Sequence, residues 1–167
     1  MQYTYKFNTP IGRLGVEWGS ETEKIHRVRL PSVDTTKNEY NLVDHPPLTE
    51  QQLPSWVSSI INEFQKYFLG YSAKFSLDYL NYDNFTQFQL SVHQHVFAIP
   101  CGETRTYSEV ADAANSPGAA RAVGNTMAGN PFPVIVPCHR VVAQDGGLGG
   151  YRGGLDAKKF LLALERE

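Results

Sequence analysis

The sequence is poor in cysteine, and this limits the roles that its thiols can have. Cys101 and Cys138 are too few for a disulfide framework, and no second pair is present to hold a zinc ion through thiolates. In a reducing compartment both are free thiols, so each is a candidate nucleophile. The alternative for either residue is a small buried side chain that packs as a hydrophobe.

Long apolar runs are also missing, so the sequence predicts no membrane span. Residues 1–6 alternate in polarity and lack the basic start and apolar stretch of a signal peptide. The hydrophobic content of 41% and the charged content of 19% are typical of a folded chain rather than a disordered one. We therefore expect a soluble, cytoplasmic protein, associated with the nucleoid if the source is prokaryotic.

The chain has no excess of positive charge, and its net charge of −2 does not by itself indicate nucleic-acid binding. Residues 1–84 contain 8 Lys/Arg and 10 Asp/Glu, whereas residues 85–167 contain 7 of each. The stretch 117–152 carries three arginines and one aspartate, a local charge of +2. This stretch is compatible with a basic surface, although isolated arginines are more often simply solvated.

Alternating polarity marks the beginning of the chain. Residues 3–7 and 14–18 alternate on either side of the turn-forming segment 8–12, which predicts a β-hairpin. Residues 25–30 indicate a third strand, and the polar residues 32–47 indicate a loop. The first part of the chain is thus expected to contain an antiparallel sheet.

A helix is expected to follow this sheet. Trp56, Ile60, Phe64 and Phe68 recur every four residues, and Gly70 stands where a glycine ends many helices. Alternation returns at residues 75–79, which indicates another extended segment. These patterns predict a small α/β unit.

The second half of the chain shows helical periodicity. Apolar residues of the segment 85–99 share one face, and Pro100 ends the run. Thr106 and Glu109 have the spacing of a capping box, which predicts a short helix over residues 107–114. The second half is therefore expected to be mostly helical.

A second short helix is expected close to the first. Ser116 and Pro117 favour an N-cap and a first-turn proline for a helix over residues 118–128. Two short helices joined by a tight turn form a helix-turn-helix candidate. A glycine-rich loop, 146–154, then precedes a last amphipathic helix whose apolar residues are Leu155, Phe160, Leu161 and Leu164.

Cys138 lies in the run Pro137-Cys138-His139-Arg140, where a nucleophile and a base are adjacent. A thiol attacks as the thiolate, and a neighbouring imidazole can accept its proton. Adjacent side chains of an extended strand point to opposite faces, so contact would require a turn or a bridging water. Pro137 fixes one backbone angle and favours such an irregular shape. The residues therefore permit activation of Cys138 by His139 without demonstrating it.

The residues around Cys138 carry a resemblance to a known family. Residues 129–142 read Gly-Asn-Pro-Phe-Pro-Val-Ile-Val-Pro-Cys-His-Arg-Val-Val, and this segment resembles the active-site signature of the O6-alkylguanine-DNA alkyltransferases (methylated-DNA–protein-cysteine methyltransferases). The first 84 residues resemble the family's variable N-terminal domain only in length and in Thr9-Pro10-Ile11-Gly12. Beyond this segment, the resemblance covers nearly all of residues 85–167. It includes the runs 99–104, 106–107, 120–124, 150–154 and 158–162.

The resemblance implies a fold and a domain division. Residues 1–84 would be a variable, RNase H-like α/β domain with an antiparallel sheet plus a helix, ending in a linker. Residues 85–167 would be the DNA-binding and alkyl-acceptor domain, mostly α-helical and similar to a winged helix-turn-helix. The expected partner is double-stranded DNA containing O6-alkylguanine, and the resemblance implies a monomer that needs no cofactor and no metal.

The resemblance also implies an activity, which is DNA repair by direct reversal. A methyl or alkyl group would move irreversibly from O6 of guanine, and less well from O4 of thymine, to Cys138, once per molecule. The nucleotide would first be flipped out of the stack by a protein bound in the minor groove. His139 would act through a water, Glu165 would complete the relay, Asn130 would brace the turn, and Tyr107 would donate a hydrogen bond to a ring nitrogen of the base.

The remaining implied site residues fall into two groups. The base pocket would be walled by Tyr107, Val141, Gly149, Tyr151, Arg152 and Gly153. The DNA contacts would come from Thr106, Ser108, Ala120, Arg121 and Gly124, with Arg121 as the finger that occupies the space of the flipped nucleotide.

Several of these residues keep an alternative when they are judged from the sequence alone. Glu165 can be a solvated charge at the end of a helix, Tyr107 a packed aromatic and Arg121 a surface charge. A part for Lys158 in catalysis is left open, and Cys101 is interpreted as structural. Each alternative predicts a different burial and different contacts for its residue than the role in the site does.

Three rival function classes are considered. A non-catalytic sensor of alkylated bases carries another residue at the cysteine position, so Cys138 argues against it. A papain-like hydrolase requires an oxyanion hole and repeated turnover, and a plain helix-turn-helix regulator would bind DNA without chemistry.

The sequence departs from the family pattern in two places. Arg152 stands where a small residue is common in the family, and the N-terminal part lacks the cysteine-rich zinc module of the family's regulator form.

Overall fold

The computed structural model describes residues 1–31 and 48–167 and divides into two compact units, Met1–Asn81 and Tyr82–Glu167. The loop expected over residues 32–47 lies outside the described residues. The predicted domain boundary, between residues 84 and 85, lies close to the division between the units and remains a prediction about the domains. Among the described residues, no helix is long and apolar enough to cross a bilayer.

The first unit is built on the predicted antiparallel sheet. Its strands β1 (Gln2–Thr9), β2 (Gly12–Gly19) and β3 (Ile25–Arg29) pair in the order β1-β2-β3. Tyr3 pairs with Trp18 and Phe7 pairs with Leu14, so apolar side chains of both strands lie on one face. The predicted hairpin and the third strand are confirmed.

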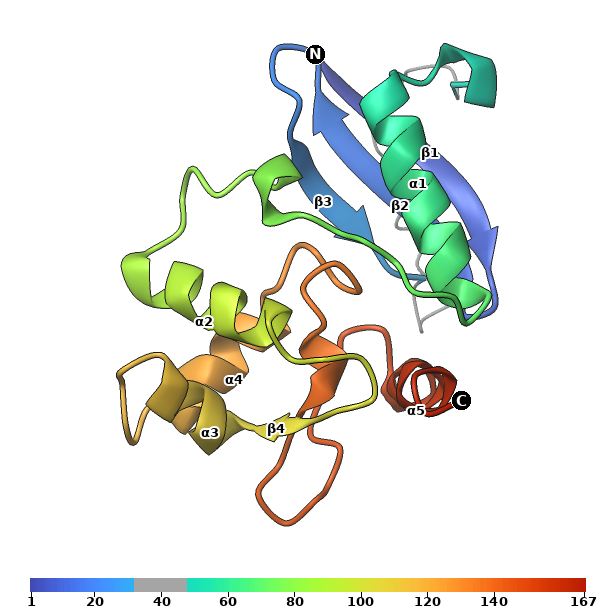
Figure 1. Ribbon diagram of the computed structural model, residues 1–167. Coiled ribbons are helices and arrows are strands. Elements are labelled where there is room, and N and C mark those ends of the chain that lie inside the picture. Colours follow the sequence, from blue (N-terminus) through green and yellow to red (C-terminus); the bar gives the residue numbers. More distant parts are fainter. Residues whose placement is uncertain (32–47) are drawn as a thin grey trace. The chain divides into compact units, whose positions relative to one another are not determined.

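Helix α1 (Ser55–Phe68) lies along the sheet in Figure 1 and packs on its apolar face. The ring centroids of Phe7 and Phe64 are 5.6 Å apart, and those of Trp18 and Trp56 are 6.4 Å apart. Gly70 has φ +81°, and the backbone N–H groups of residues 70 and 71 donate to carbonyls of the last helical turn, as in a Schellman motif. The predicted helix and its terminal glycine are confirmed.

The extended segment predicted over residues 75–79 is wrong. This segment contains a 3-10 helix, η2 (Leu77–Tyr79), because the Ser76 hydroxyl accepts a hydrogen bond from the Asp78 backbone N–H at 3.1 Å and turns the chain. Only the next residue, Leu80, forms an isolated bridge to Ile25. Another short 3-10 helix, η1 (Glu50–Gln52), precedes α1.

The second unit is mainly helical. Helices α2 (Gln87–Phe97), α3 (Tyr107–Ala113) and α4 (Ala120–Ala128) contact one another (Figure 1). The Thr106 hydroxyl accepts from the Glu109 backbone N–H at 3.1 Å, and the Glu109 carboxylate accepts from the Thr106 N–H at 2.7 Å. The predicted capping box is confirmed.

Ser116 does not cap the second short helix as predicted. Its backbone N–H donates to the Ala111 carbonyl, while Asn115 adopts φ +54° and donates to Asp112. These two bonds form the C-terminal motif of α3, so Ser116 ends one helix instead of beginning the next. Helix α4 begins later, at Ala120, without a side-chain cap.

The last part of the chain brings the Cys138 run beside the start of α3. A 3-10 helix, η3 (Cys138–Arg140), leads directly into β5 (Val141–Val142). Strand β5 pairs in parallel with β4 (Arg105–Thr106), which immediately precedes α3. Helix α5 (Leu155–Leu164) contacts η3 and ends the unit.

The apolar face predicted for the last helix is partly wrong. Leu161 is fully buried as expected, but Leu155 and Phe160 are 48% and 37% exposed. Leu162 and the aliphatic stem of Lys158 are buried in their place. A lysine stem can fill such a position when its ammonium finds partners, and polarity alone does not reveal this.

Candidate active site

Cys138 lies in a turn rather than in an extended strand. Pro137 has φ −78° and ψ 67°, the Cys138 N–H donates to the Val136 carbonyl at 2.8 Å, and the Arg140 N–H donates to the Pro137 carbonyl at 2.9 Å. Cys138 is 8% exposed and His139 is fully buried. The adjacent nucleophile and imidazole therefore occupy one tight turn, which is the geometry that their cooperation requires.

Asn130 fixes the segment that leads to this turn. Its side-chain amide donates to the Val136 carbonyl at 2.9 Å, and its side-chain oxygen accepts from the Phe132 N–H at 2.9 Å. Asn130 is 3% exposed, so these bonds are sheltered from water. Val134 within the segment has φ +72°, a strained angle for a β-branched residue. The bonds of Asn130 help to hold this strained backbone in place.

His139 and Glu165 form a buried pair. The His139 Nε2 lies 2.6 Å from the Glu165 Oε1, and the side chains are 0% and 1% exposed. Burial lowers the pKa of His139, Glu165 acts in the opposite direction, and Arg140 and Lys158 lower it further. Glu165 is therefore part of the site and not the solvated helix charge that its terminal position allowed.

The environment of the Cys138 sulfur contains opposing influences. Burial raises the pKa of the Cys138 thiol, whereas a hydrogen bond from the Asn130 side chain and the charge of Lys158 act in the opposite direction. Backbone hydrogen bonds at Cys138 and His139 also lower this pKa. The thiol thus has groups around it that stabilise its anion, but burial favours the protonated form.

Lys158 is buried and reaches the glycine-rich loop over residues 146–154. Its ammonium donates to the Val141 carbonyl at 2.8 Å and to the Leu148 carbonyl. Burial lowers the pKa of Lys158, while the nearby Cys138 raises it. The sequence left the role of Lys158 open. Its ammonium is held by two backbone carbonyls, and it is close enough to Cys138 for the charge of each group to affect the other.

Tyr107 and Tyr151 flank the same region. Burial and, secondarily, the charge of Cys138 raise the pKa of Tyr107, and burial followed by the charges of Cys138 and Glu165 raises that of Tyr151. A Cβ atom on Gly149, which has φ +67°, would lie 2.8 Å from the Tyr107 hydroxyl oxygen. Gly149 therefore provides room that a larger residue would take from Tyr107.

The other predicted residues lie around this centre with different exposures. Val141 is buried, Tyr151 and Gly153 are half-buried, and Arg152 is exposed. Arg121 is exposed in the first turn of α4. The remaining predicted DNA contacts, all half-buried, are Thr106, Ser108, Ala120 and Gly124.

Arg140 is a site residue that sequence reasoning did not assign. Its guanidinium Nε donates to the Glu165 Oε2 at 2.9 Å, its Nη2 donates to the Glu165 Oε1 at 3.0 Å, and its Nη1 donates to the Ile99 carbonyl at 2.6 Å. The signal available in the sequence was its position beside His139. Its partners are distant in sequence, so no local pattern predicted them.

Cys101 is exposed, so the alternative of a small buried side chain is wrong for this residue, while its interpretation as structural stays a prediction. Partial desolvation and the charge of Glu165 raise the pKa of its thiol. Cys101 lies in the turn between α2 and β4, where Gly102 donates its N–H to the Glu165 Oε2 at 3.3 Å. Cys138 is the thiol that has the imidazole in its own turn.

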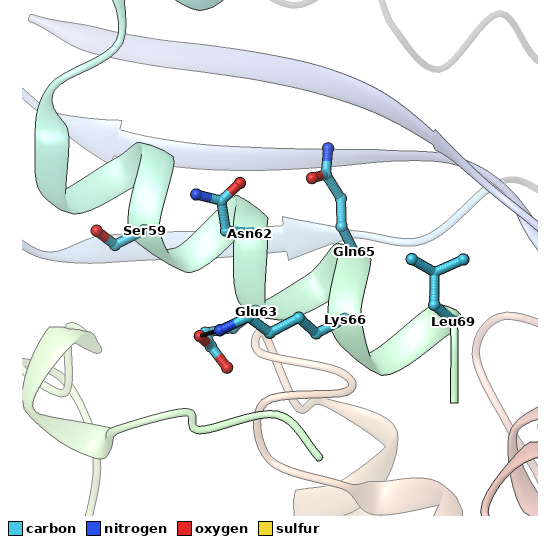
Figure 2. A pocket seen from close by; sticks show the side chains of 6 residues that line it. All are labelled: Ser59, Asn62, Glu63, Gln65, Lys66 and Leu69. Carbon is cyan, nitrogen blue, oxygen red and sulfur yellow. Dashed lines mark hydrogen bonds and ion pairs between the residues drawn. The ribbon is translucent and has the colours of Figure 1, made fainter. Parts of the chain in front are cut away.

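The first unit carries a surface hollow that lacks comparable chemistry. Figure 2 shows six side chains from α1 and its C-cap around it. Among the residues described there, Lys66 and Glu63 form an exposed ion pair at 2.6 Å, and the others are amides, a hydroxyl and a leucine. An exposed ion pair of this kind contributes little binding energy, so we assign no site to it.

Comparison with known proteins gives consistent matches. The family described as 6-O-methylguanine DNA methyltransferase, DNA binding domain, matches residues 87–167. A methylated-DNA–protein-cysteine methyltransferase of Mycobacterium tuberculosis is 43% identical over 113 residues, which cover 68% of this chain and 67% of that protein. A methylated-DNA–protein-cysteine methyltransferase of Haemophilus influenzae is 35% identical over 166 residues, which cover 99% of this chain and 87% of that protein.

The fold has matches among solved structures. The crystal structure of M. tuberculosis OGT in complex with DNA superposes with a TM-score of 0.77 at 34% identity, covering 98% of this chain and 92% of that one. A structure of an O6-methylguanine DNA methyltransferase from Methanococcus jannaschii gives a TM-score of 0.62 at 28% identity, covering 96% and 92%. The chain therefore belongs to the methylated-DNA–protein-cysteine methyltransferase family.

Proposed function

We propose that this protein repairs alkylated DNA by direct reversal, with Cys138 as the alkyl acceptor. The observation that carries the proposal is the buried turn in which the Cys138 thiol is followed by an imidazole paired with Glu165 at 2.6 Å. The substrate is double-stranded DNA containing O6-alkylguanine, and O4-alkylthymine is a poorer substrate. Family membership supports the reaction, and the geometry supports the choice of residue.

The proposed chemistry is a displacement at the alkyl carbon. The Cys138 thiol transfers its proton through a water to His139, the sulfur bonds to the alkyl carbon, and the bond between that carbon and O6 breaks. The Tyr107 hydroxyl keeps its proton and donates a hydrogen bond to a ring nitrogen of the departing guanine, which stabilises the guanine anion, and that anion is then protonated from water while His139 returns its proton to water. The product is a thioether that thiol exchange does not reverse, so each molecule reacts once.

The base must leave the helix before this reaction can occur. O6 of guanine lies within a base pair, and extrusion of the nucleotide costs a few kcal/mol. We propose that α3 and α4 form a winged helix-turn-helix-like element in the minor groove, with Arg121 inserted in the space of the flipped base. The exposure of Arg121 at the start of α4 supports this role.

The rest of the proposed assignment concerns the pocket and the domains. Val141, Gly149, Tyr151, Arg152 and Gly153 would line the base pocket together with Tyr107. Thr106, Ser108, Ala120 and Gly124 would contact DNA near Arg121. The RNase H-like character of residues 1–84, the assignment of DNA binding to residues 85–167, the monomeric state and a cytoplasmic location stay predictions.

The direct test mixes pure protein with a duplex that contains one O6-methylguanine and then maps peptides by mass spectrometry. We expect one methyl group on Cys138 and at most one equivalent of repaired base per protein molecule. Cys138→Ser should remove the transfer, and Cys101→Ser, the matched control, should keep it. An intact lesion with folded protein, methyl on Cys101, or repeated turnover would each contradict the proposal, and repeated turnover would favour a hydrolase.

A further inference from the structure

Glu165 is the common partner of two basic side chains. Its Oε1 contacts both the His139 Nε2 at 2.6 Å and the Arg140 Nη2 at 3.0 Å, while its Oε2 accepts from the Arg140 Nε at 2.9 Å. The Arg140 side chain is 12% exposed and that of Glu165 is 1% exposed. One carboxylate therefore faces a permanent cation and an imidazole that can be charged or neutral.

We propose that Arg140 is a positioning residue that balances the charge of Glu165 and so keeps the His139 imidazole neutral, with its proton on Nε2 and its lone pair on Nδ1. This inference rests on the proposed function, because a neutral imidazole is the form that can accept the Cys138 proton.

The tautomer follows from the hydrogen-bonding capacity of the groups. An ionised carboxylate only accepts hydrogen bonds, so the His139 nitrogen beside it must carry the proton. Arg140 is always charged and forms a bidentate pair with Glu165, which is the geometry that a guanidinium favours. The carboxylate thus remains an anion, and its charge is already balanced before His139 takes up a second proton.

The other groups around His139 act in the same direction. Lys158 of α5 opposes a second proton on His139, and burial of the imidazole does so more strongly. Without Arg140, the carboxylate would be the dominant charge beside the imidazole and would favour the imidazolium form. The protonation of His139 is therefore set within a group of titratable and charged side chains. Glu165, Lys158, Arg140 and Cys138 lie around the imidazole, and Cys101 and Tyr151 lie near Glu165.

Arg140 also ties the site to the preceding helix. Its Nη1 donates to the carbonyl of Ile99, a buried residue just after α2. This bond gives the guanidinium a second anchor, which does not involve Glu165. A lysine would keep the charge but could not hold Ile99 and both carboxylate oxygens together, whereas a glutamine would keep a hydrogen-bond donor without the charge.

The test measures the His139 ring nitrogens by ¹⁵N NMR as a function of pH in the intact protein, without DNA. In the wild type at neutral pH, we expect one protonated nitrogen, Nε2, and one unprotonated nitrogen, Nδ1. In Arg140→Gln, the titration midpoint of His139 should rise by about one pH unit, since a nearby charge shifts a pKa by about 1 to 3 units. Arg140→Lys should stay within a few tenths of the wild type.

A matched control is Arg105→Gln, which breaks an exposed arginine–glutamate pair with Glu103 and should leave the His139 titration unchanged. A doubly protonated imidazole in the wild type at neutral pH, or a proton on Nδ1, would overturn the proposal. The proposal would also be overturned if the His139 titration midpoint in Arg140→Gln equalled that of the wild type. If the glutamine variant does not fold, the wild-type spectrum still tests the tautomer, and a His139 midpoint in Arg140→Lys that rises by a full pH unit would overturn the proposal, because the lysine keeps the charge.

The repair rate separates this inference from the proposed function. If His139 is the base, the acid limb of the rate profile of Arg140→Gln should move to higher pH together with the imidazole titration. A shifted titration with an unshifted rate profile would support the role of Arg140 and contradict His139 as the base. A wild type that does not repair the lesion would contradict the proposed function, while the tautomer and the titration would still be measured.

Discussion

At Cys138, burial and hydrogen bonding change the pKa of the thiol in opposite directions. Burial raises the pKa of the thiol, and the Asn130 hydrogen bond, the Lys158 charge and the backbone bonds reduce that rise without reversing it. A thiol that is mostly protonated at rest reacts little with chance electrophiles. A base in the same turn is then needed when the substrate is in place.

This balance predicts how the free protein reacts with iodoacetamide. Because the pKa of Cys138 lies above its ordinary value, the thiolate is lost as pH falls, so the alkylation rate should rise through the alkaline range. Asn130→Ala should slow alkylation of Cys138 further at each pH, and the exposed Asn125→Ala should not. Peptide mapping distinguishes Cys138 from Cys101. A rate that is already maximal at neutral pH would contradict this.

Arg121 tests the flipping step at the level of one side chain. Arg121→Ala should slow repair in a duplex by at least about tenfold, since the side chain offsets part of the few kcal/mol that unstacking costs. Reaction with a free O6-alkylated base, which needs no flipping, should change little. Arg27→Ala, an exposed arginine of the first unit, serves as the control. Equal losses with duplex and free base would exclude the role as a finger.

At the scale of elements, the sequence predicted what short-range interactions determine. The capping box of Thr106 and Glu109 was correct because both partners lie within one helical turn. Ser116 has the residue type of an N-cap, yet the C-terminal motif of α3 uses its backbone N–H. Residue type alone does not show which of two neighbouring helices a turn residue serves.

Members of the candidate site could be named from the sequence, but the hydrogen bonds between them could not. The resemblance pointed to His139 and Glu165, and the structure brings them to 2.6 Å. The bond from Arg140 to Ile99 joins residues that are 41 positions apart, and that from Arg140 to Glu165 joins residues 25 apart. Such bonds depend on the packing of α2 and α5 around the turn, which periodicity does not describe.

Helix α2 contributes a buried imidazole that the proposed reaction does not use. His93 is 1% exposed within a cluster of Tyr82, Phe85 and Phe132, and Tyr82 Oη lies 3.4 Å from the His93 Nδ1. Burial lowers the pKa of His93 to about 4. Phe132 belongs to the segment held by Asn130, so this cluster supports the backbone that leads to Cys138.

His93 should make the second unit sensitive to acid. The unfolded chain binds a proton at His93 near pH 6.5, whereas the folded chain resists it to about pH 4, so the stability present above 6.5 is lost as pH falls between these values. The loss is at most about 3 kcal/mol. His93→Phe should flatten this dependence, and the exposed His95→Gln should not.

The measurement must report on the second unit. Both tryptophans, Trp18 and Trp56, lie in the first unit, so their fluorescence does not follow α2. Hydrogen exchange of the α2 amides between about pH 4 and 7 is the suitable probe, after correction for the intrinsic rate. The same acid dependence in His93→Phe and the wild type would contradict the assignment to His93.

At the scale of the whole molecule, charge is scarce where DNA is proposed to bind. The chain has a net charge of −2, and its local excess over residues 117–152 consists of Arg121, Arg140 and Arg152 against one aspartate. Arg140 is committed to Glu165 and Ile99. Two exposed arginines therefore remain in this stretch to bring positive charge to the DNA, Arg121 as the proposed finger and Arg152 at the proposed base pocket, and we expect the rest of the affinity to come from uncharged contacts and from the flipped base.

This distribution predicts a weak salt dependence of DNA binding. If these two cations displace about two counterions, the logarithm of the association constant should fall with a slope of about −2 against the logarithm of salt concentration, or roughly tenfold between about 50 and 200 mM. Fluorescence anisotropy with Cys138→Ser and a labelled duplex measures it without reaction. Arg121→Ala should reduce the slope by about 1, because a cation inserted between the strands displaces a counterion just as a phosphate contact does, and Arg27→Ala should leave the slope unchanged. A slope near −5 would mean that basic side chains outside residues 117–152 bind the phosphates, and the low net charge would then be a poor guide to the interface.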